Sequence, residues 1–113
     1  MHELSITINV LNIVEEYAKK LNAKIVHEIE MDIGELSGVD DDALQFAMQC
    51  TVKSELLESA ELVINKISAK AKCKECNHEF NISDFYAFCT ICNSFDKKII
   101  QGKELKVRSI KID

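Results

Sequence analysis

Two closely spaced cysteine pairs constrain the fold of this chain more than any other feature. They lie in the stretch CKECNHEFNISDFYAFCTIC, where Cys73 and Cys76 form one C-x2-C motif and Cys89 and Cys92 form the other. Each motif places two sulfur atoms on one tight turn, and two such turns complete a tetrahedron around a zinc ion with Zn–S bonds of about 2.3 Å. Four thiolates fill the coordination sphere, so the zinc is expected to be structural and not catalytic. The spacing therefore predicts a zinc-ribbon-like mini-domain.

A redox role for one cysteine pair is the main alternative to zinc. Thioredoxin-like chemistry uses a single C-x2-C motif at the start of a helix, whereas here the motif recurs and asparagine follows each copy, as Asn77 and Asn93. Asparagine tolerates positive φ better than any residue except glycine, so both turns are expected to bend in the same way. His78 is an alternative zinc ligand, but we expect it to be an exposed turn residue. The pattern favours zinc over a disulfide.

The composition restricts the compartment and the class of partner. The 113 residues, 47% of them hydrophobic, suffice for one modest core with an appendage. Five cysteines, an odd number without a secretion signal, favour metal ligation in the cytoplasm over disulfides. The net charge is −5, and residues 72–98 carry four lysines against four acidic residues, so we expect no nucleic-acid partner. No apolar segment approaches the ~20 residues that span a bilayer, so we expect no membrane partner.

Hydrophobic periodicity predicts an α+β fold. Apolar residues spaced three or four apart predict two helices, and alternating or continuous apolar runs predict three strands. In chain order these five elements span residues 4–21, 24–33, 40–55, 61–71 and 103–113. The helix between the first two strands makes them a parallel pair, and the last strand returns after the cysteine segment. We therefore expect a small three-stranded mixed sheet covered by two helices, with the four-cysteine, zinc-ribbon-like mini-domain inserted before the last strand.

Individual residues carry further structural expectations. Cys50 lies in the second predicted helix with no neighbouring base, so we expect a packed, unreactive side chain. His27 falls on the apolar face of the first predicted strand, where we expect a residue at the sheet margin. The apolar positions of the last strand change phase between Val107 and Ile110, which predicts a bulge near Ser109. The mini-domain is expected to build its core from aromatic side chains, namely Phe80, Phe85, Tyr86 and Phe88.

Four motifs together resemble the HypA/HybF family, the nickel metallochaperones of hydrogenase maturation. They are MHELS at the start, GELSGVD after the first predicted strand, the two C-x2-C pairs, and GKELKVRSIKI near the end. The resemblance covers essentially the whole chain, with the motifs in the family's order and spacing. The family often has proline inside each cysteine pair and glycine after it, whereas this chain has CKECN and CTICN. The cysteines themselves are intact.

The resemblance implies delivery of nickel to the large subunit of a nickel-iron hydrogenase, in concert with the GTPase HypB, and in some members delivery to urease with its maturation proteins. It implies no catalytic turnover. The family's nickel ligand falls on His2, and its structural zinc ligands fall on the four cysteines of the two pairs. The nickel-binding domain is then expected to comprise residues 1–70 and 101–113, and the zinc-binding domain residues 71–100.

The chemistry of the chain start agrees with this implication. A bulky second residue blocks removal of Met1, so the Met1 amine, the deprotonated His2 amide and the His2 imidazole can close two fused chelate rings. The fourth in-plane donor is expected from Glu3 or from Asp40 in the GELSGVD turn. Four nitrogen or oxygen donors in a plane suit Ni(II) or Cu(II) and disfavour zinc. The alternative role of Glu3 is to oppose the dipole at the start of the first helix.

Two other functions stay open from the sequence. A zinc-ribbon adaptor that binds only protein would have MHE as an incidental chain end and would be indifferent to nickel. An oxidoreductase that uses a C-x2-C pair would lose thiols reversibly under mild oxidant and release zinc. Nickel titration of the untagged protein separates the first of these from a metallochaperone.

Overall fold

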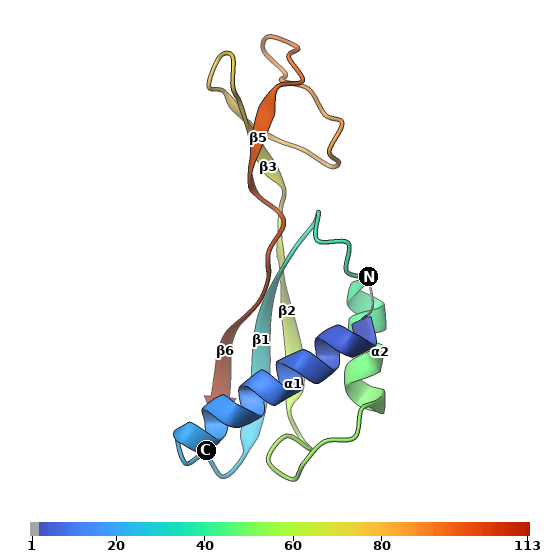
Figure 1. Cartoon of the computed structure of the whole chain (residues 1–113), viewed down its shortest axis with the longest axis vertical. Coiled ribbons are helices and arrows are strands. Elements are labelled where there is room, and N and C mark those ends of the chain that lie inside the picture. The colour runs from blue at the N-terminus through green and yellow to red at the C-terminus, as the bar shows by residue number, and fades with distance from the viewer. Residues whose placement is uncertain (1–2) are drawn as a thin grey trace. The chain divides into compact units, whose positions relative to one another are not determined.

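The structure is a computed structural model, and it describes residues 3–113 (Figure 1). These residues form two helices and six strands. In chain order they are α1 (Glu3–Lys20), β1 (Val26–Gly34), α2 (Asp41–Cys50), β2 (Glu61–Ile67), β3 (Lys70–Cys73), β4 (Glu79–Asn81), β5 (Lys97–Gln101) and β6 (Leu105–Ile112). The strands form two three-stranded sheets, with the orders β2-β1-β6 and β4-β3-β5. The first of two compact units contains the described residues up to Met31, Val39–Asn65 and Lys106–Asp113, and the second contains Asp32–Gly38 and Lys66–Leu105.

Helix α1 buries one stripe of its surface in the first unit. Its buried side chains recur three or four residues apart, at Thr7, Val10, Leu11, Val14 and Ala18. The helix ends in a Schellman motif, because Asn22 has a φ of 56° and the N–H of Ala23 donates to the carbonyl of Ala18 at 3.0 Å. Asparagine here takes the left-handed position that glycine usually occupies. Within residues 3–113, neither helix combines the length and the apolar character that crossing a bilayer requires.

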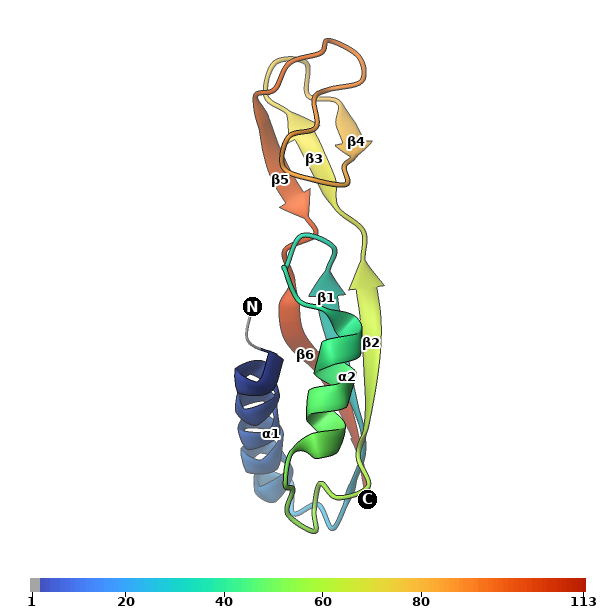
Figure 2. The ribbon, with the colours of Figure 1, turned by 90° about the vertical axis from the view of Figure 1, so that its right-hand side faces the viewer.

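Strand β1 lies at the centre of the first sheet, between β2 and β6. Figure 2 shows the arrowheads of β1 and β2 pointing the same way, while β6 runs in the opposite direction in Figure 1. The N–H of Val26 donates to the carbonyl of Leu56 at 2.9 Å, and the N–H of Asp113 donates to that of Ile25 at 2.9 Å. His27 is exposed at this margin of the sheet, with its Nε2 2.8 Å from Oδ2 of Asp113. The predicted three-stranded mixed sheet with two helices is confirmed.

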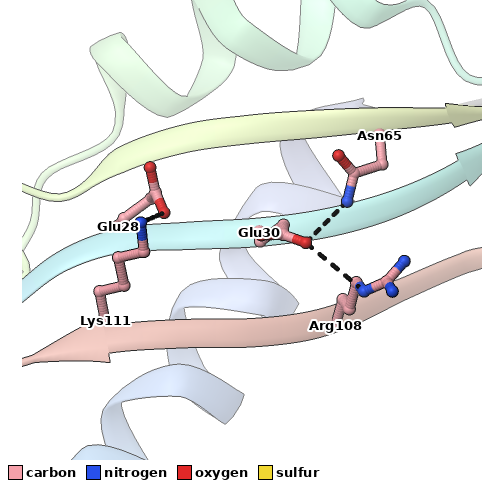
Figure 3. Close-up of polar contacts among 5 residues, drawn as sticks. All are labelled: Glu28, Glu30, Asn65, Arg108 and Lys111. Carbon is pink, nitrogen blue, oxygen red and sulfur yellow. Dashed lines mark hydrogen bonds and ion pairs between the residues drawn. The ribbon is translucent and has the colours of Figure 1, made fainter.

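Two ion pairs join β6 to β1 on one face of the first sheet. Arg108 Nε lies 3.5 Å from Oε1 of Glu30, and Lys111 Nζ lies 3.1 Å from Oε2 of Glu28 (Figure 3). The two cations are three residues apart in β6, whereas their carboxylate partners are two apart in β1. All four side chains project on one face, with α1 behind the strands. A regular strand places residues three apart on opposite faces, so the shared face of Arg108 and Lys111 supports the bulge predicted near Ser109.

The prediction of one strand over residues 61–71 is wrong. The segment divides into β2 and β3, which belong to different sheets. Between them, the carbonyl of Ser68 accepts from the side-chain amide of Gln101 at 2.8 Å, and the carbonyl of Ala69 accepts from the N–H of Ile82 at 3.0 Å. Both partners come from parts of the chain remote in sequence. The apolar run over residues 61–71 therefore could not reveal where the strand divides, because the division depends on hydrogen bonds to these remote residues.

Helix α2 is shorter than predicted, and this changes the position of Cys50. The helix ends at Cys50, and Thr51 is extended with φ −77° and ψ 134°. The buried face of the helix consists of Leu44, Ala47 and Met48. Cys50 lies in the last turn of the helix, does not belong to this buried face, and is exposed. The expectation of a packed Cys50 side chain is therefore wrong.

The second unit has a small core of its own. Its buried members are Ala69, Ala71, Cys73, Phe80, Ile82 and Cys89, with Leu36, Ala87 and Ile99 packed against them. Of the four aromatic residues expected in this core, Phe80 alone is buried, while Phe85, Tyr86 and Phe88 are 50%, 82% and 51% exposed. Alanines and buried cysteines take up the space instead. The expectation of an aromatic core is therefore wrong for three of the four residues.

Candidate metal centre

The four cysteines of the two C-x2-C motifs meet at one point in the second unit. Their Sγ atoms all lie within 4.8 Å of one another. The Sγ atoms of Cys73 and Cys92 are 3.5 Å apart, and those of Cys76 and Cys89 are 3.6 Å apart. A tetrahedron with Zn–S bonds of about 2.3 Å has edges of about 3.8 Å. The cluster therefore has the donor set and nearly the dimensions of a zinc site with four thiolates.

The two cysteine turns are built in the same way. Asn77 and Asn93 have φ values of 62° and 60°. The N–H of Asn77 donates to the carbonyl of Cys73, and the N–H of Asn93 donates to that of Cys89, each at 3.0 Å. Asparagine reaches this left-handed conformation at little cost. The expectation that both turns bend alike is confirmed, although neither turn has the glycine that the family often uses.

Backbone N–H groups make the sulfur atoms unequal in acidity. The N–H of Cys92 and that of Ile91, which lies 3.4 Å from Sγ of Cys89, together outweigh burial and lower the pKa of Cys89 to about 6. At Cys92 the N–H of Ser94 favours the thiolate, but the neighbouring Cys73 thiol and burial raise the pKa of Cys92 to about 12. At neutral pH the metal-free cluster therefore combines a thiolate at Cys89 with a proton on Cys92 that a metal ion must displace.

His78 lies beside the cysteine cluster without belonging to it. Within residues 3–113, the side chains that converge as a set of metal donors are the four cysteines. The His78 imidazole instead stacks on the ring of Phe80, with the centroids 6.2 Å apart and the planes at 9°. This packing leaves His78 half-buried, which is less exposure than expected of a turn residue.

Of the four residues expected to bind nickel, the structure describes Glu3, at the start of α1, and Asp40, just before α2. Met1 and His2 lie outside the described residues. Glu3 opens α1, and its Oε2 accepts from the backbone N–H of Asp40 at 3.3 Å. Asp40 is the N-cap of α2, where its Oδ1 accepts from the N–H of Ala43 at 3.0 Å. The fold thus brings together two candidate oxygen donors that are 37 residues apart in the chain.

The GELSG part of the GELSGVD motif has a structural role that the sequence analysis did not identify. The N–H of Glu35 donates to the carbonyl of Ile67 at 2.9 Å, and the N–H of Leu36 donates to the carbonyl of Gly102 at 2.7 Å. A Cβ atom at Gly34 would lie 2.0 Å from the carbonyl oxygen of Gly102, so the two backbones approach more closely than any side chain allows. Gly34 and Gly102 are two of only three glycines in the chain. Because the chain has so few glycines, their positions were the sequence signal that could have indicated this close approach.

Comparison with known proteins gives matches over the whole chain. The family model described as "Hydrogenase/urease nickel incorporation, metallochaperone, hypA" matches residues 1–112. A hydrogenase maturation factor HypA from Parabacteroides distasonis is 39% identical over 112 residues, which cover 99% of this chain and 97% of the relative. A protein of the same name from Francisella philomiragia is 41% identical over 110 residues, which cover 97% of each chain.

Solved structures are similar over the same extent. The solution structure of the Ni metallochaperone HypA from Helicobacter pylori has a TM-score of 0.70 and 30% identity, covering 99% of this chain and 97% of that one. A second solution structure of a HypA protein has a TM-score of 0.74 and 30% identity, with coverage of 99% and 96%.

Proposed function

The chain belongs to the HypA family, and from this premise we propose that it binds Ni(II) through its N-terminal residues and delivers the ion during maturation of a nickel-iron hydrogenase. Membership confirms the resemblance inferred from MHELS, GELSGVD, the cysteine pairs and GKELKVRSIKI. The relatives are named maturation factors, and one structural neighbour is named a Ni metallochaperone. Nickel is then a cargo that the protein carries, and no catalytic role is proposed.

The contact between Glu3 and Asp40 is the observation that carries the nickel proposal. The two carboxylates lie at the starts of α1 and α2, joined by the 3.3 Å hydrogen bond from the Asp40 N–H. His2 directly precedes Glu3 in the chain. Nitrogen donors from Met1 and His2, completed by a carboxylate oxygen, form a set suited to Ni(II).

Asp40 can contribute an oxygen without giving up its helix cap. Its Oδ1 is engaged by the N–H of Ala43 at 3.0 Å, and the second carboxylate oxygen of this exposed residue remains as a donor. Glu3 is similar, because its Oε2 accepts from the N–H of Asp40 and its other carboxylate oxygen remains as a donor. We assign the nickel-binding role to His2 with Met1, Glu3 and Asp40 as co-ligands, within a domain of residues 1–70 and 101–113.

A structural zinc ion completes the proposal. Cys73, Cys76, Cys89 and Cys92 would hold Zn2+ within residues 71–100, and the ion would join the two cysteine turns. Cys73 and Cys89 are fully buried in the small core, so their sulfur atoms hold the metal and fill space at once. Four thiolates leave no open position for a substrate.

The remaining parts of the proposal concern partners and compartment. Acting in a maturation pathway requires a source and an acceptor for the ion, which we assign to the GTPase HypB and the hydrogenase large subunit, with urease maturation proteins as further partners. We assign the protein to the cytoplasm. Copurification with tagged HypB and with the large-subunit precursor tests these partners separately.

Calorimetric titration with Ni(II) at neutral pH tests the nickel site. Three zinc-loaded, untagged proteins are compared: the native chain, a chain extended by one residue before Met1, and His2→Ala. The extension converts the terminal amine to an amide, and the substitution removes the imidazole. Both should abolish tight nickel binding and leave zinc content unchanged. Copper should compete with nickel in the native protein, because it stands higher in the Irving–Williams order.

Equal nickel affinity in all three proteins would instead favour the alternative function, a zinc-ribbon adaptor that binds only protein. The exposed aromatic residues of the second unit make that alternative concrete, since Phe85, Tyr86 and Phe88 are each at least half exposed.

A further inference from the structure

An open hollow of about 500 Å³ lies on the second unit, in the segment that follows β4 and includes the second cysteine turn. Its lining includes two aromatic side chains, those of Tyr86 and Phe88, and one acidic side chain, that of Asp84. None of the described residues that line the hollow is a lysine or an arginine. The hollow is therefore an aromatic surface with a carboxylate and no basic side chain.

The two aromatic side chains of the hollow face solvent. Tyr86 is 82% exposed and Phe88 is 51% exposed. Phe95 supports Phe88 from one side, because their rings meet edge to face with the centroids 4.6 Å apart. Single exposed apolar residues are ordinary on protein surfaces, but two exposed aromatic rings that border one hollow are typical of a binding site.

Hydrogen bonds fix the segment that presents these rings. Oδ1 of Asp84 accepts from the backbone N–H of Tyr86 at 2.8 Å, which closes an Asx turn. The carbonyl of Phe85 accepts from Nζ of Lys97 on β5 at 2.8 Å. The hollow therefore exists before a ligand arrives, so a ligand does not have to order the loop as it binds.

The charge of Asp84 selects the class of ligand. Its side chain is exposed, and while Oδ1 accepts from Tyr86, the second oxygen remains as an acceptor. A carboxylate repels phosphate groups, so the hollow is unsuited to a nucleic acid or to an anionic membrane. A cation is favoured twice, because it pairs with the carboxylate and is attracted to the negative faces of the aromatic rings.

The neighbouring Phe85 already makes such a contact within the chain. Nζ of Lys103 lies over its ring, 5.8 Å from the centroid. Phe85 does not line the hollow, so this lysine serves a different ring. Among the described residues, no basic side chain covers Tyr86 or Phe88 in the same way. The cation that suits the hollow must therefore come from another molecule.

We propose that this hollow binds an arginine side chain of a partner protein. The planar guanidinium group can stack on one ring while its N–H groups donate to the free carboxylate oxygen of Asp84. Arginine suits the site better than lysine, because a guanidinium group is more weakly hydrated and stacks on aromatic faces. The proposal goes beyond nickel delivery, since all the residues that carry it belong to the second unit.

NMR titration of the isotope-labelled, full-length, zinc-loaded chain tests the proposal. The probe is the capped peptide acetyl-Gly-Leu-Arg-Leu-Gly-amide, and its control carries neutral citrulline in place of arginine. The arginine peptide should shift the amide signals of residues 84–93 and bind with a dissociation constant of roughly 1 mM. The citrulline peptide should bind about tenfold more weakly, because it lacks the charge. No nickel is added, so failure here leaves the nickel proposal untouched.

A matched pair of charge variants tests the role of Asp84. Asp84→Asn keeps an oxygen for the N–H of Tyr86 but removes the charge, so it should weaken the arginine peptide about fivefold and leave the citrulline peptide unchanged. Asp96→Asn is the control, because Asp96 is an exposed acid of the same unit that pairs with Lys74 at 3.6 Å and does not line the hollow. It should change neither affinity. Equal weakening by both substitutions would overturn the proposal, because attraction to any acidic side chain would then explain the binding.

A pair of tyrosine variants tests the aromatic wall. Tyr86→Leu keeps an apolar side chain but removes the ring, and it should weaken the arginine peptide about threefold or more. Tyr17→Leu makes the same change at the other tyrosine of the chain, in the first unit, and should have no effect. Zinc content and the amide spectrum of each variant check that the second unit is intact.

Three further results would overturn the proposal. The first is an arginine peptide that leaves the signals of residues 84–93 unmoved. The second is equal affinity for the arginine and citrulline peptides. The third is a stronger response of the same signals to single-stranded oligothymidylate or to phosphatidylglycerol vesicles, which would assign the exposed rings to a nucleic acid or a membrane instead.

Discussion

The backbone N–H of Asp40 lies 3.3 Å from Oε2 of Glu3, so the start of α1 is tied to the residue that caps α2. Besides its proposed role as a nickel ligand, Asp40 caps α2, because its Oδ1 accepts from the N–H of Ala43 at 3.0 Å. A change at this residue can therefore act on helix stability, on nickel binding, or on both. Substitutions that separate the charge of Asp40 from its capping oxygen distinguish the two roles.

Asp40→Asn should weaken nickel binding while preserving the fold, because asparagine caps helices as well as aspartate but lacks the charge. Asp40→Ala should weaken nickel binding to a similar degree and also cost about 1 kcal/mol of unfolding free energy through the lost cap. Calorimetry with Ni(II) and urea denaturation measure the two effects. If all three proteins bind nickel equally, Asp40 serves only as a cap.

Protein purified without added metal should contain one zinc ion per chain, because the second unit has too small an apolar core to fold without it. Elemental analysis measures the stoichiometry. Cys73→Ser removes a buried ligand and should abolish both bound zinc and the dispersed amide signals of the second unit. Metal-free protein with an ordered second unit and five reactive thiols would contradict a structural role for zinc.

Cys50→Ala should change the unfolding free energy by less than about 0.5 kcal/mol, since Cys50 is exposed and its removal leaves no cavity. Zinc and nickel contents should match those of the native protein. The variant also provides a chain in which every remaining thiol belongs to the metal cluster. A loss of stoichiometric zinc in this variant would show that Cys50 takes part in metal binding.

Acid should release nickel before zinc. A free terminal amine and an imidazole ordinarily have pKa values of about 7.7 to 8.0 and about 6.5, so protons displace nickel as the pH falls below about 6. The N–H groups of Cys92 and Ile91 lower the pKa of Cys89 to about 6, so without metal its thiolate predominates only above about pH 6, and bound zinc extends it to lower pH. Metal release measured with a chelating dye across a range of about pH 4 to 8 checks the order. Release of zinc first would contradict it.

Gly34→Ala should destabilise the protein by more than about 2 kcal/mol, because the added Cβ would lie 2.0 Å from the backbone oxygen of Gly102. Gly38→Ala is the matched control in the same motif. At Gly38 a Cβ meets nothing within 4 Å, so the cost is limited to its φ of +78°, about 1 kcal/mol. Thermal unfolding of both variants measures the difference. Equal destabilisation would mean that the close approach at Gly34 is not maintained in solution.

The metal cluster shows how far local reasoning reaches. Both cysteine turns are predictable from a few residues each, and the positive φ of Asn77 and Asn93 follows from the same local geometry. Spacing along the chain determines which sulfur atoms share a turn, and four sulfur atoms in two turns admit few arrangements around one ion. The meeting of the turns, with 3.5 Å between Cys73 and Cys92, was therefore predictable without knowledge of the rest of the fold.

Burial was less predictable, because it depends on what packs against a residue from elsewhere. Phe85 and Phe88 are residues of a type that usually forms a core, yet both are half exposed. The core of the second unit is built instead from residues that include Ala71, Phe80 and the buried cysteines. Cys50 has the pattern of a helix interior, but α2 ends there. In each case the local pattern is compatible with two environments, and only the packing selects one.

The sequence alone determined the helix α1, the central strand, the cysteine turns and the family, since each depends on residue periodicity or on motifs within a few positions. Only the tertiary structure decided where the run 61–71 divides and that Glu3 accepts from Asp40. The physical reason is the range of the interaction. Turn geometry and amphipathic periodicity arise between neighbours in the chain, whereas strand pairing and carboxylate placement arise between segments whose proximity the folded chain alone creates.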